Sequence, residues 1–212
     1  MDRGGVDAVL AISTSKPTVD VVDSLVRLHD DVGDCRLCPR LVDWRERVAI
    51  EKRAAYRHDE YWGRGVAGFG RAMHRAGFAD RPTSVSVDDG LTLIDAWVTA
   101  AVKCAPPGNA PLPDERTNCR PFLVRELALL HRLRVIVCLG GFAYEAACRH
   151  FGVRPKPKFG HGVEVTIDAG AGRSLGLLCS FHPSQQNTFT GRLTEPMLDA
   201  VFTRAGELAR CP

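Results

Sequence analysis

The sequence lacks any apolar run approaching the roughly 18 residues that a membrane-spanning helix needs. Its beginning shows no basic segment followed by an apolar one, so we expect no signal peptide and a cytoplasmic location. The net charge of +3 is too small to indicate a nucleic-acid partner by itself. A length of 212 residues and a hydrophobic content of 45% are typical of one soluble domain. We expect a loose arm over residues 1–18 and a single domain over residues 19–212.

Buried strands are also scarce. Apolar runs predict only three core strands, and an alternating pattern predicts one edge strand: residues 93–102, 134–139 and 175–181, and the edge at 163–167. Helical patterns occupy much of the rest: residues 19–32, 40–57, 71–78, 113–133, 141–151 and 194–208. The alternation of strands and helices predicts a parallel sheet between helix layers, for which three core strands are few.

Cysteine, in contrast, is abundant, with eight residues. In a chain expected to stay reduced, clustered cysteines indicate a metal site rather than disulfides. Three cysteines lie in apolar runs and are predicted to be core residues: Cys138, Cys148 and Cys179. Four others stand apart from such runs: Cys35, Cys38, Cys104 and Cys119.

The spacing of these four cysteines is Cys-x2-Cys, a long insertion, and Cys-x14-Cys. Structural zinc normally uses two close pairs, and the second pair here is not close. Four thiolates from separated segments suit a [4Fe–4S] cluster, and Pro39 directly after Cys38 is also found beside such clusters. A zinc site and four unrelated cysteines stay open as alternatives.

A polar loop, residues 181–192, follows the last predicted core strand. It carries a histidine, three amides, three hydroxyls and an arginine. Open α/β sheets place their chemistry at strand ends, so this density of donors favours a binding loop over a solvated turn. The segment 149–161 is basic and contains no acid, which is typical of either a phosphate contact or a solvated face.

Six motifs follow one another from about Val32 to the carboxyl terminus: Cys35–Arg40, Tyr61–Arg64, Cys104–Asn109, Leu139–Gly141, Phe159–Gly162 and His182–Asn187. Together they resemble the family 5 (type-5) uracil-DNA glycosylases, which are iron–sulfur members of the uracil-DNA glycosylase superfamily. The resemblance implies a three-layer α/β/α fold with a central, mainly parallel sheet. It also implies a [4Fe–4S] cluster on the four cysteines and excision of uracil and related deaminated bases from DNA.

The resemblance also implies roles for single residues. Asn109 resembles the base-reading asparagine, because a side-chain amide can match the N3 donor and O4 acceptor of uracil. His182 resembles the histidine that stabilises the departing uracil anion. The remaining candidates are expected to contact DNA: Gln185, Gln186, Asn187, Arg192 and Lys158. The expected partner is DNA that contains uracil or other deaminated bases, and we expect a monomer that does not bind membranes.

One departure from the family is large. In the family, the glycine-rich loop is followed by a buried strand and by a loop that includes an aspartate. Here Gly70 leads directly into residues 71–78, which resemble the next helix. We therefore expect the first strand and its loop to be absent, and the neighbouring strands to keep unpaired backbone groups. The chain would then be unstable, with weak or no excision.

Three aspartates survive near a strand start, at the end opposite to the expected site: Asp88, Asp89 and Asp95. They do not supply the base that hydrolysis needs. One alternative function is therefore a catalytically impaired iron–sulfur DNA-binding member of the same family. Another is a zinc-stabilised α/β protein that does not act on DNA.

Overall fold

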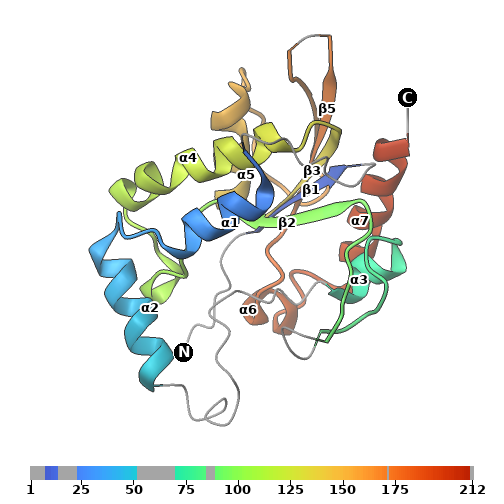
Figure 1. Ribbon diagram of the computed structural model, residues 1–212. Coiled ribbons are helices and arrows are strands. Elements are labelled where there is room, and N and C mark those ends of the chain that lie inside the picture. Colours follow the sequence, from blue (N-terminus) through green and yellow to red (C-terminus); the bar gives the residue numbers. More distant parts are fainter. Residues whose placement is uncertain (1–7, 14–22, 52–69, 85–88, 171, 211–212) are drawn as a thin grey trace.

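The computed structural model describes residues 8–13, 23–51, 70–84, 89–170 and 172–210 (Figure 1). The helices are α1 (Leu25–Gly33), α2 (Pro39–Glu51), α3 (Gly70–Arg75), α4 (Pro113–Leu129), α5 (Gly141–Phe151), α6 (Gln185–Phe189) and α7 (Glu195–Arg210). The strands are β1 (Ala8–Ser13), β2 (Ala96–Ala100), β3 (Leu133–Leu139), β4 (Glu164–Asp168) and β5 (Ser174–Ser180). They form one sheet in the order β2-β1-β3-β5-β4.

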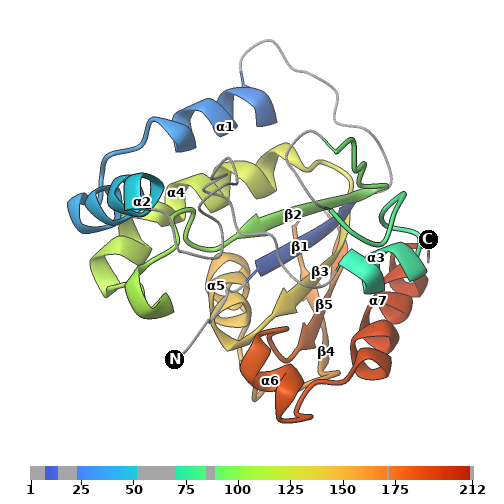
Figure 2. The same ribbon diagram turned by 90° about the horizontal axis from the view of Figure 1, so that it is seen from below.

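The sheet lies between two helix layers (Figures 1 and 2). Alternate side chains of β3 point to opposite faces, as they do in any strand. Ile136 and Cys138 pack into the core on the side of α1, α4 and α5, whereas Val135 and Val137 pack into the core on the side of α3 and α7. This confirms the expected α/β/α architecture, with β3 buried at its centre.

The direction of the strands fixes which loops meet. β3 and β5 are parallel, and β2 runs the same way because β2 and β3 are both antiparallel to β1. β4 is antiparallel to β5 and forms one edge of the sheet. The three predicted core strands and the predicted edge strand are thus confirmed. The sheet is mixed, however, because two of its five strands run against the others.

The loose arm expected over residues 1–18 is wrong for Ala8–Ser13. This segment forms β1, which lies between β2 and β3 and is antiparallel to both. β1 thereby pairs the edges of β2 and β3 that face each other in the sheet. The expected unpaired edges of β2 and β3 therefore do not arise, and this reason for an unstable chain is removed.

Most predicted helices are present with shifted ends. α1 and α2 are shorter in the described ranges than the predicted helices at 19–32 and 40–57, parts of which lie outside the described residues. Residues 181–192 were predicted as a polar loop, but part of this segment forms the short helix α6. Ser184 caps its start by accepting a hydrogen bond from the Asn187 backbone N–H.

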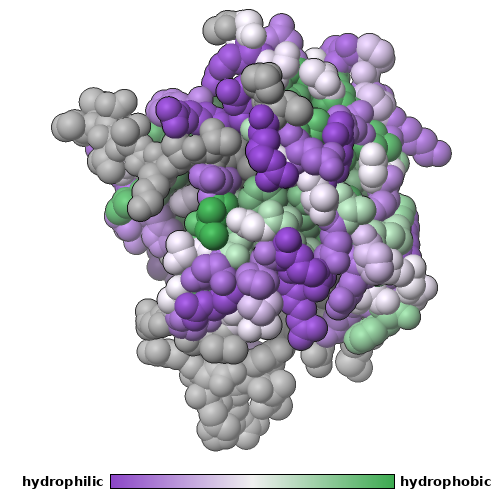
Figure 3. Space-filling model, turned by 90° about the vertical axis from the view of Figure 1, so that its right-hand side faces the viewer, coloured by the Kyte–Doolittle hydropathy of each residue, from purple (hydrophilic) through white to green (hydrophobic). Residues whose placement is uncertain are grey.

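The face of the molecule on the side of α3 and α7 is mainly hydrophilic, with smaller hydrophobic areas between the polar side chains (Figure 3). Within the residues that the structure describes, no helix is long and apolar enough to span a membrane.

Candidate functional site

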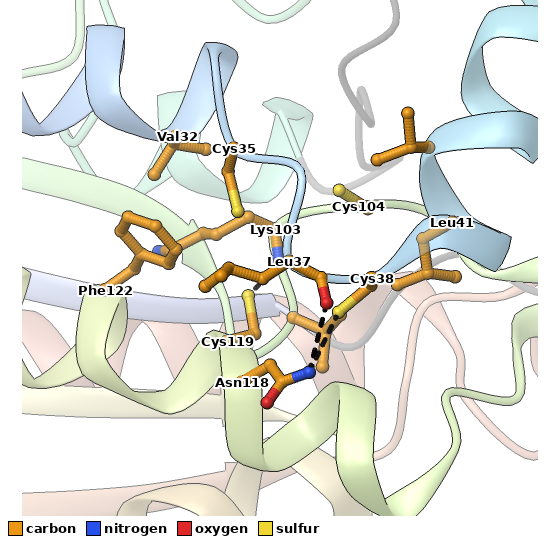
Figure 4. A pocket seen from close by; sticks show the side chains of 12 residues that line it. Val32, Cys35, Leu37, Cys38, Leu41, Lys103, Cys104, Asn118, Cys119 and Phe122 are labelled. Atoms are coloured by element: carbon orange, nitrogen blue, oxygen red, sulfur yellow. Dashed lines mark hydrogen bonds between the residues drawn. The ribbon is translucent and has the colours of Figure 1, made fainter.

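Four cysteines line one pocket, which we call the cysteine pocket (Figure 4). Cys35 and Cys38 come from the connection between α1 and α2, Cys104 from the loop after β2, and Cys119 from α4. The remaining walls are mostly apolar and include Val32, Leu37, Leu41, Val42, Val102 and Phe122. The fold therefore gathers all four cysteines that the sequence singled out, from three segments far apart in the chain.

Three of these sulfur atoms are each approached by a hydrogen-bond donor. The pairs are the Arg45 guanidinium with Cys104 (3.7 Å), the Asn118 amide with Cys38 (3.7 Å) and the Lys103 backbone N–H with Cys119 (3.1 Å). Donors directed at sulfur favour the thiolate form and tune iron–sulfur clusters. Burial acts in the opposite direction: it raises the pKa of Cys104, and it raises the pKa of Cys119 to about 11. A metal that binds here must displace these protons.

The four thiols surround the cysteine pocket (Figure 4). Within the described ranges, no three or more Cys, His, Asp or Glu side chains form a group that could hold one metal ion. Zinc needs its sulfur ligands at about 2.3 Å from a single centre. In the part of the chain that the structure describes, the thiols therefore do not form such a single-ion site.

A buried ion pair lies behind the cysteine pocket. Lys103 and Glu126 pair through Nζ and Oε2, with side chains only 10% and 7% exposed. The Glu126 carboxylate also accepts hydrogen bonds from Trp97 Nε1 (2.8 Å) and from Thr99 Oγ1 (2.5 Å), both on β2. Because the Lys103 backbone binds Cys119, this network fixes the wall of the pocket to the sheet.

Asn109 ends the short 3-10 helix η2 (Pro107–Asn109), in the loop after the carboxyl end of β2. Its backbone N–H donates to the Pro106 carbonyl over 3.0 Å. Its φ of 57° lies in the left-handed region, which asparagine adopts more readily than most residues. The side chain is half-buried.

His182 lies two residues after the carboxyl end of β5, and its side chain is half-buried. The Asn187 side-chain amide donates to the His182 carbonyl over 2.8 Å. Asn187 therefore holds the turn that carries His182, a structural role that the sequence analysis did not predict for it.

His161 supports the same turn from below. Its Nδ1 accepts the Phe181 backbone N–H over 3.3 Å, and the two rings lie 5.3 Å apart between centroids. Burial lowers the pKa of His161, which favours the neutral ring that this acceptor role needs. The Arg192 guanidinium also lies over the Phe181 ring, 4.6 Å from its centroid. Phe181 thus joins His161 and Arg192 beneath the His182 turn.

Asn109 and His182 lie at the same edge of the sheet, because β2 and β5 run in the same direction. β1 and β3 separate the two strands, so their axes are about 14 Å apart at the usual strand spacing. This edge is where open α/β sheets bind ligands. Asp95 precedes β2 and therefore lies at the opposite edge, as predicted.

The other DNA-contact candidates surround this edge or flank it. Gln185 and Gln186 are exposed at the start of α6, and Phe189 at its end is 83% exposed. Lys158 is exposed in the loop between α5 and β4. The Tyr61–Arg64 motif lies outside the described residues.

Several residues of the site were not predicted. Arg45, Asn118 and Glu126 looked like ordinary helix-surface residues in the sequence, because their partners are remote along the chain. His161 stood in a recognised motif but had no assigned role. A polar residue one position before a cysteine, such as Asn118, is a sequence signal that could have indicated a hydrogen-bond donor to the cysteine site.

Residues 52–205 match the family model of the Uracil DNA glycosylase superfamily. A type-5 uracil-DNA glycosylase of Mycobacterium bovis is 42% identical over 88% of this chain and 82% of that relative. Those of Thermus thermophilus and Pyrobaculum aerophilum are 39% and 34% identical, over 82% and 84% of this chain and 94% and 90% of the relatives.

The alignment with the M. bovis relative covers 224 positions, more than the 212 residues of this chain. That relative therefore has residues without a counterpart here, which agrees with an absent strand and loop. The family match covers more than half of the chain, and the relatives match over most of it. The chain belongs to the uracil-DNA glycosylase superfamily, among the type-5 uracil-DNA glycosylases.

Proposed function

We propose that this chain removes uracil and related deaminated bases from DNA by hydrolysing the N-glycosidic bond. The observation that carries the proposal is the placement of Asn109 and His182 after the carboxyl ends of β2 and β5, at one edge of the sheet. The names of the relatives favour this enzyme over a binding protein without catalysis.

In this proposal, the target base leaves the DNA stack and enters the space between the two loops. The Asn109 amide reads the base edge, because its acceptor faces N3–H and its donor faces O4 of uracil. His182 stabilises the negative charge that develops on the departing uracil. Asn187 and His161 position the His182 turn through its carbonyl and through the Phe181 N–H.

DNA binding is assigned to the exposed residues around the same edge. The exposed side chains of Gln185 and Gln186 contact the DNA strand in this proposal, and the exposed Phe189 ring inserts where the flipped base has left the stack. Lys158 and Arg192 supply positive charge for phosphates.

Excision should appear as alkali-labile cleavage of an oligonucleotide that contains uracil. We expect His182→Ala to lower kcat by about 10²–10³-fold, the usual effect of losing one donor to a developing anion. Val26→Ala, a change at an exposed position of α1 that has no assigned role in the site, is the control and should keep kcat. Equal kcat in His182→Ala and the unchanged chain would contradict the proposed role. The same assay tests the expectation of weak excision.

We also propose that Cys35, Cys38, Cys104 and Cys119 hold a [4Fe–4S] cluster. Support comes from the four thiols around one pocket, the apolar walls and the N–H donors directed at sulfur. When bound, such a cluster links its protein segments through iron–thiolate bonds. The cysteines would thereby join α4 to the α1–α2 connection and to the loop that carries Asn109.

Protein purified without oxygen should be brown and should contain iron and sulfide. We expect Cys104→Ala to lose both the colour and the bound iron, because one of the four thiolate ligands is gone. Cys148→Ala is the matched control, because Cys148 is buried in α5 and does not line the cysteine pocket. Stoichiometric zinc without iron in elemental analysis would show that the cluster proposal is wrong.

A further inference from the structure

One ion pair lies between the cysteine pocket and the Asn109 loop. Arg40, in the first turn of α2, binds Glu115, in the first turn of α4, through two hydrogen bonds. Nε donates to Oε1 and Nη2 donates to Oε2, each over 2.7 Å. The Glu115 side chain is only 3% exposed. Hydrogen bonds from Arg40 hold the pKa of Glu115 below its ordinary value. This is a bidentate arginine–carboxylate pair, in which two hydrogen bonds fix the orientation of both side chains.

The same two side chains also hold the backbone just after Asn109. Arg40 Nη2 donates to the Ala110 carbonyl over 3.3 Å, and the Leu112 N–H donates to Glu115 Oε2 over 2.7 Å. Before Asn109, its own N–H is bound by the Pro106 carbonyl. The loop is thus fixed on both sides of the residue proposed to read the base.

This fixation matters because the loop has an unfavourable backbone conformation. Gly108 and Asn109 are successive residues with φ of 60° and 57°. A left-handed conformation in a residue other than glycine persists only when the surroundings hold it. Base choice depends on this restraint, because the Asn109 amide can match the N3 donor and O4 acceptor of uracil only when the backbone holds it at the correct position against the base edge.

We propose that Arg40 and Glu115 are positioning residues that set the uracil specificity of this enzyme by restraining the Asn109 loop. The inference rests on the proposed function and adds to it. Arg40 comes two residues after Cys38, and Glu115 lies one helical turn before Cys119. The pair therefore also links the two segments that hold Cys38 and Cys119 to the loop that holds Asn109.

The test is Arg40→Gln, which removes the charge and the two-pronged geometry. Excision of uracil and of cytosine is measured in otherwise identical oligonucleotides. We expect kcat/KM for uracil to fall by about tenfold, equivalent to about 1.4 kcal/mol, while excision of cytosine relative to uracil rises. A smaller folded fraction would lower both rates equally and leave their ratio unchanged. Arg36→Gln is the control, because Arg36 pairs with Glu46 on the exposed surface.

Amide hydrogen exchange provides a readout that does not need activity. In Arg40→Gln, we expect faster exchange at Leu112, while the buried strand β3 keeps its protection. Arg40→Lys keeps the charge but loses the paired guanidinium donors, so we expect an intermediate exchange rate at Leu112. This variant replaces Arg40→Gln in the test if Arg40→Gln does not fold. If the unchanged chain does not excise uracil, the proposed function fails, and hydrogen exchange still tests separately whether Arg40 restrains the Asn109 loop. An unchanged cytosine-to-uracil ratio in an active enzyme, or unchanged exchange at Leu112, would overturn it.

Discussion

Removing residues 1–13 is expected to abolish cooperative unfolding of the domain. β1 is registered with β2 along Ala8–Ile12 and with β3 along Ala8–Ser13. Without it, two facing strand edges lose their hydrogen-bond partners inside the sheet, where every residue of β3 except Arg134 is buried. Each buried unpaired backbone group costs about 1–3 kcal/mol, whereas a whole domain is stable by only about 5–15 kcal/mol. Circular dichroism during heating measures the outcome.

Two variants separate the strand from the rest of the amino terminus. A chain that lacks only residues 1–7 keeps β1 and should melt like the full chain. Leu10→Pro should lower the melting temperature, because proline has no N–H and β1 has a partner strand on each side. An unchanged, cooperative transition after removal of residues 1–13 would show that β2 and β3 do not need β1.

Glu126→Ala is expected to destabilise the domain by about 3–5 kcal/mol, the usual result of breaking a buried ion pair. The change leaves the Lys103 ammonium nearly buried, and it deprives Trp97 and Thr99 of their acceptor. For a domain of this size, the melting temperature should fall by about 6–20 °C. Calorimetry measures the fall in melting temperature, with the variant and the unchanged chain prepared at the same metal content in the cysteine pocket.

The matched control is another Lys–Glu pair at the surface. Lys156 and Glu145 pair with side chains 41% and 52% exposed, so Glu145→Ala should cost no more than about 1 kcal/mol. Replacing both buried partners, as in Lys103→Met with Glu126→Leu, should recover stability because no unpaired charge remains. Equal melting temperatures for Glu126→Ala and Glu145→Ala would show that burial does not strengthen this pair.

The elements that the sequence predicted are those whose pattern is local. β3 and β5 are short, continuous apolar runs, and α5 and α7 follow the helical period, so each could be recognised within its own residues. β1 could not be recognised in this way. Its place depends on a gap between two other strands, which becomes visible only when the whole sheet is assembled.

The candidate site shows the same division. The cysteines were found because their spacing is a signal in itself, and the structure places them around one pocket. The residues that hold them were missed, because Arg45 meets Cys104, and Glu126 meets Lys103, only after folding. Asn109 and His182 were suggested by family motifs, and their common edge follows from strand directions that the sequence alone does not give.

The position of β1 also has a consequence for the order in which the chain can fold during synthesis. Ala8 leaves the ribosome early, but its two neighbours in the sheet are Ala100 and Leu139. β1 must therefore wait until Leu139 has been made before both of its edges can be paired. Pairings across such long sequence separations form slowly, and nascent chains expose their strand edges in the meantime. β1, an interior strand of this sheet, is thus made before both of its neighbours, and its pairing is completed late.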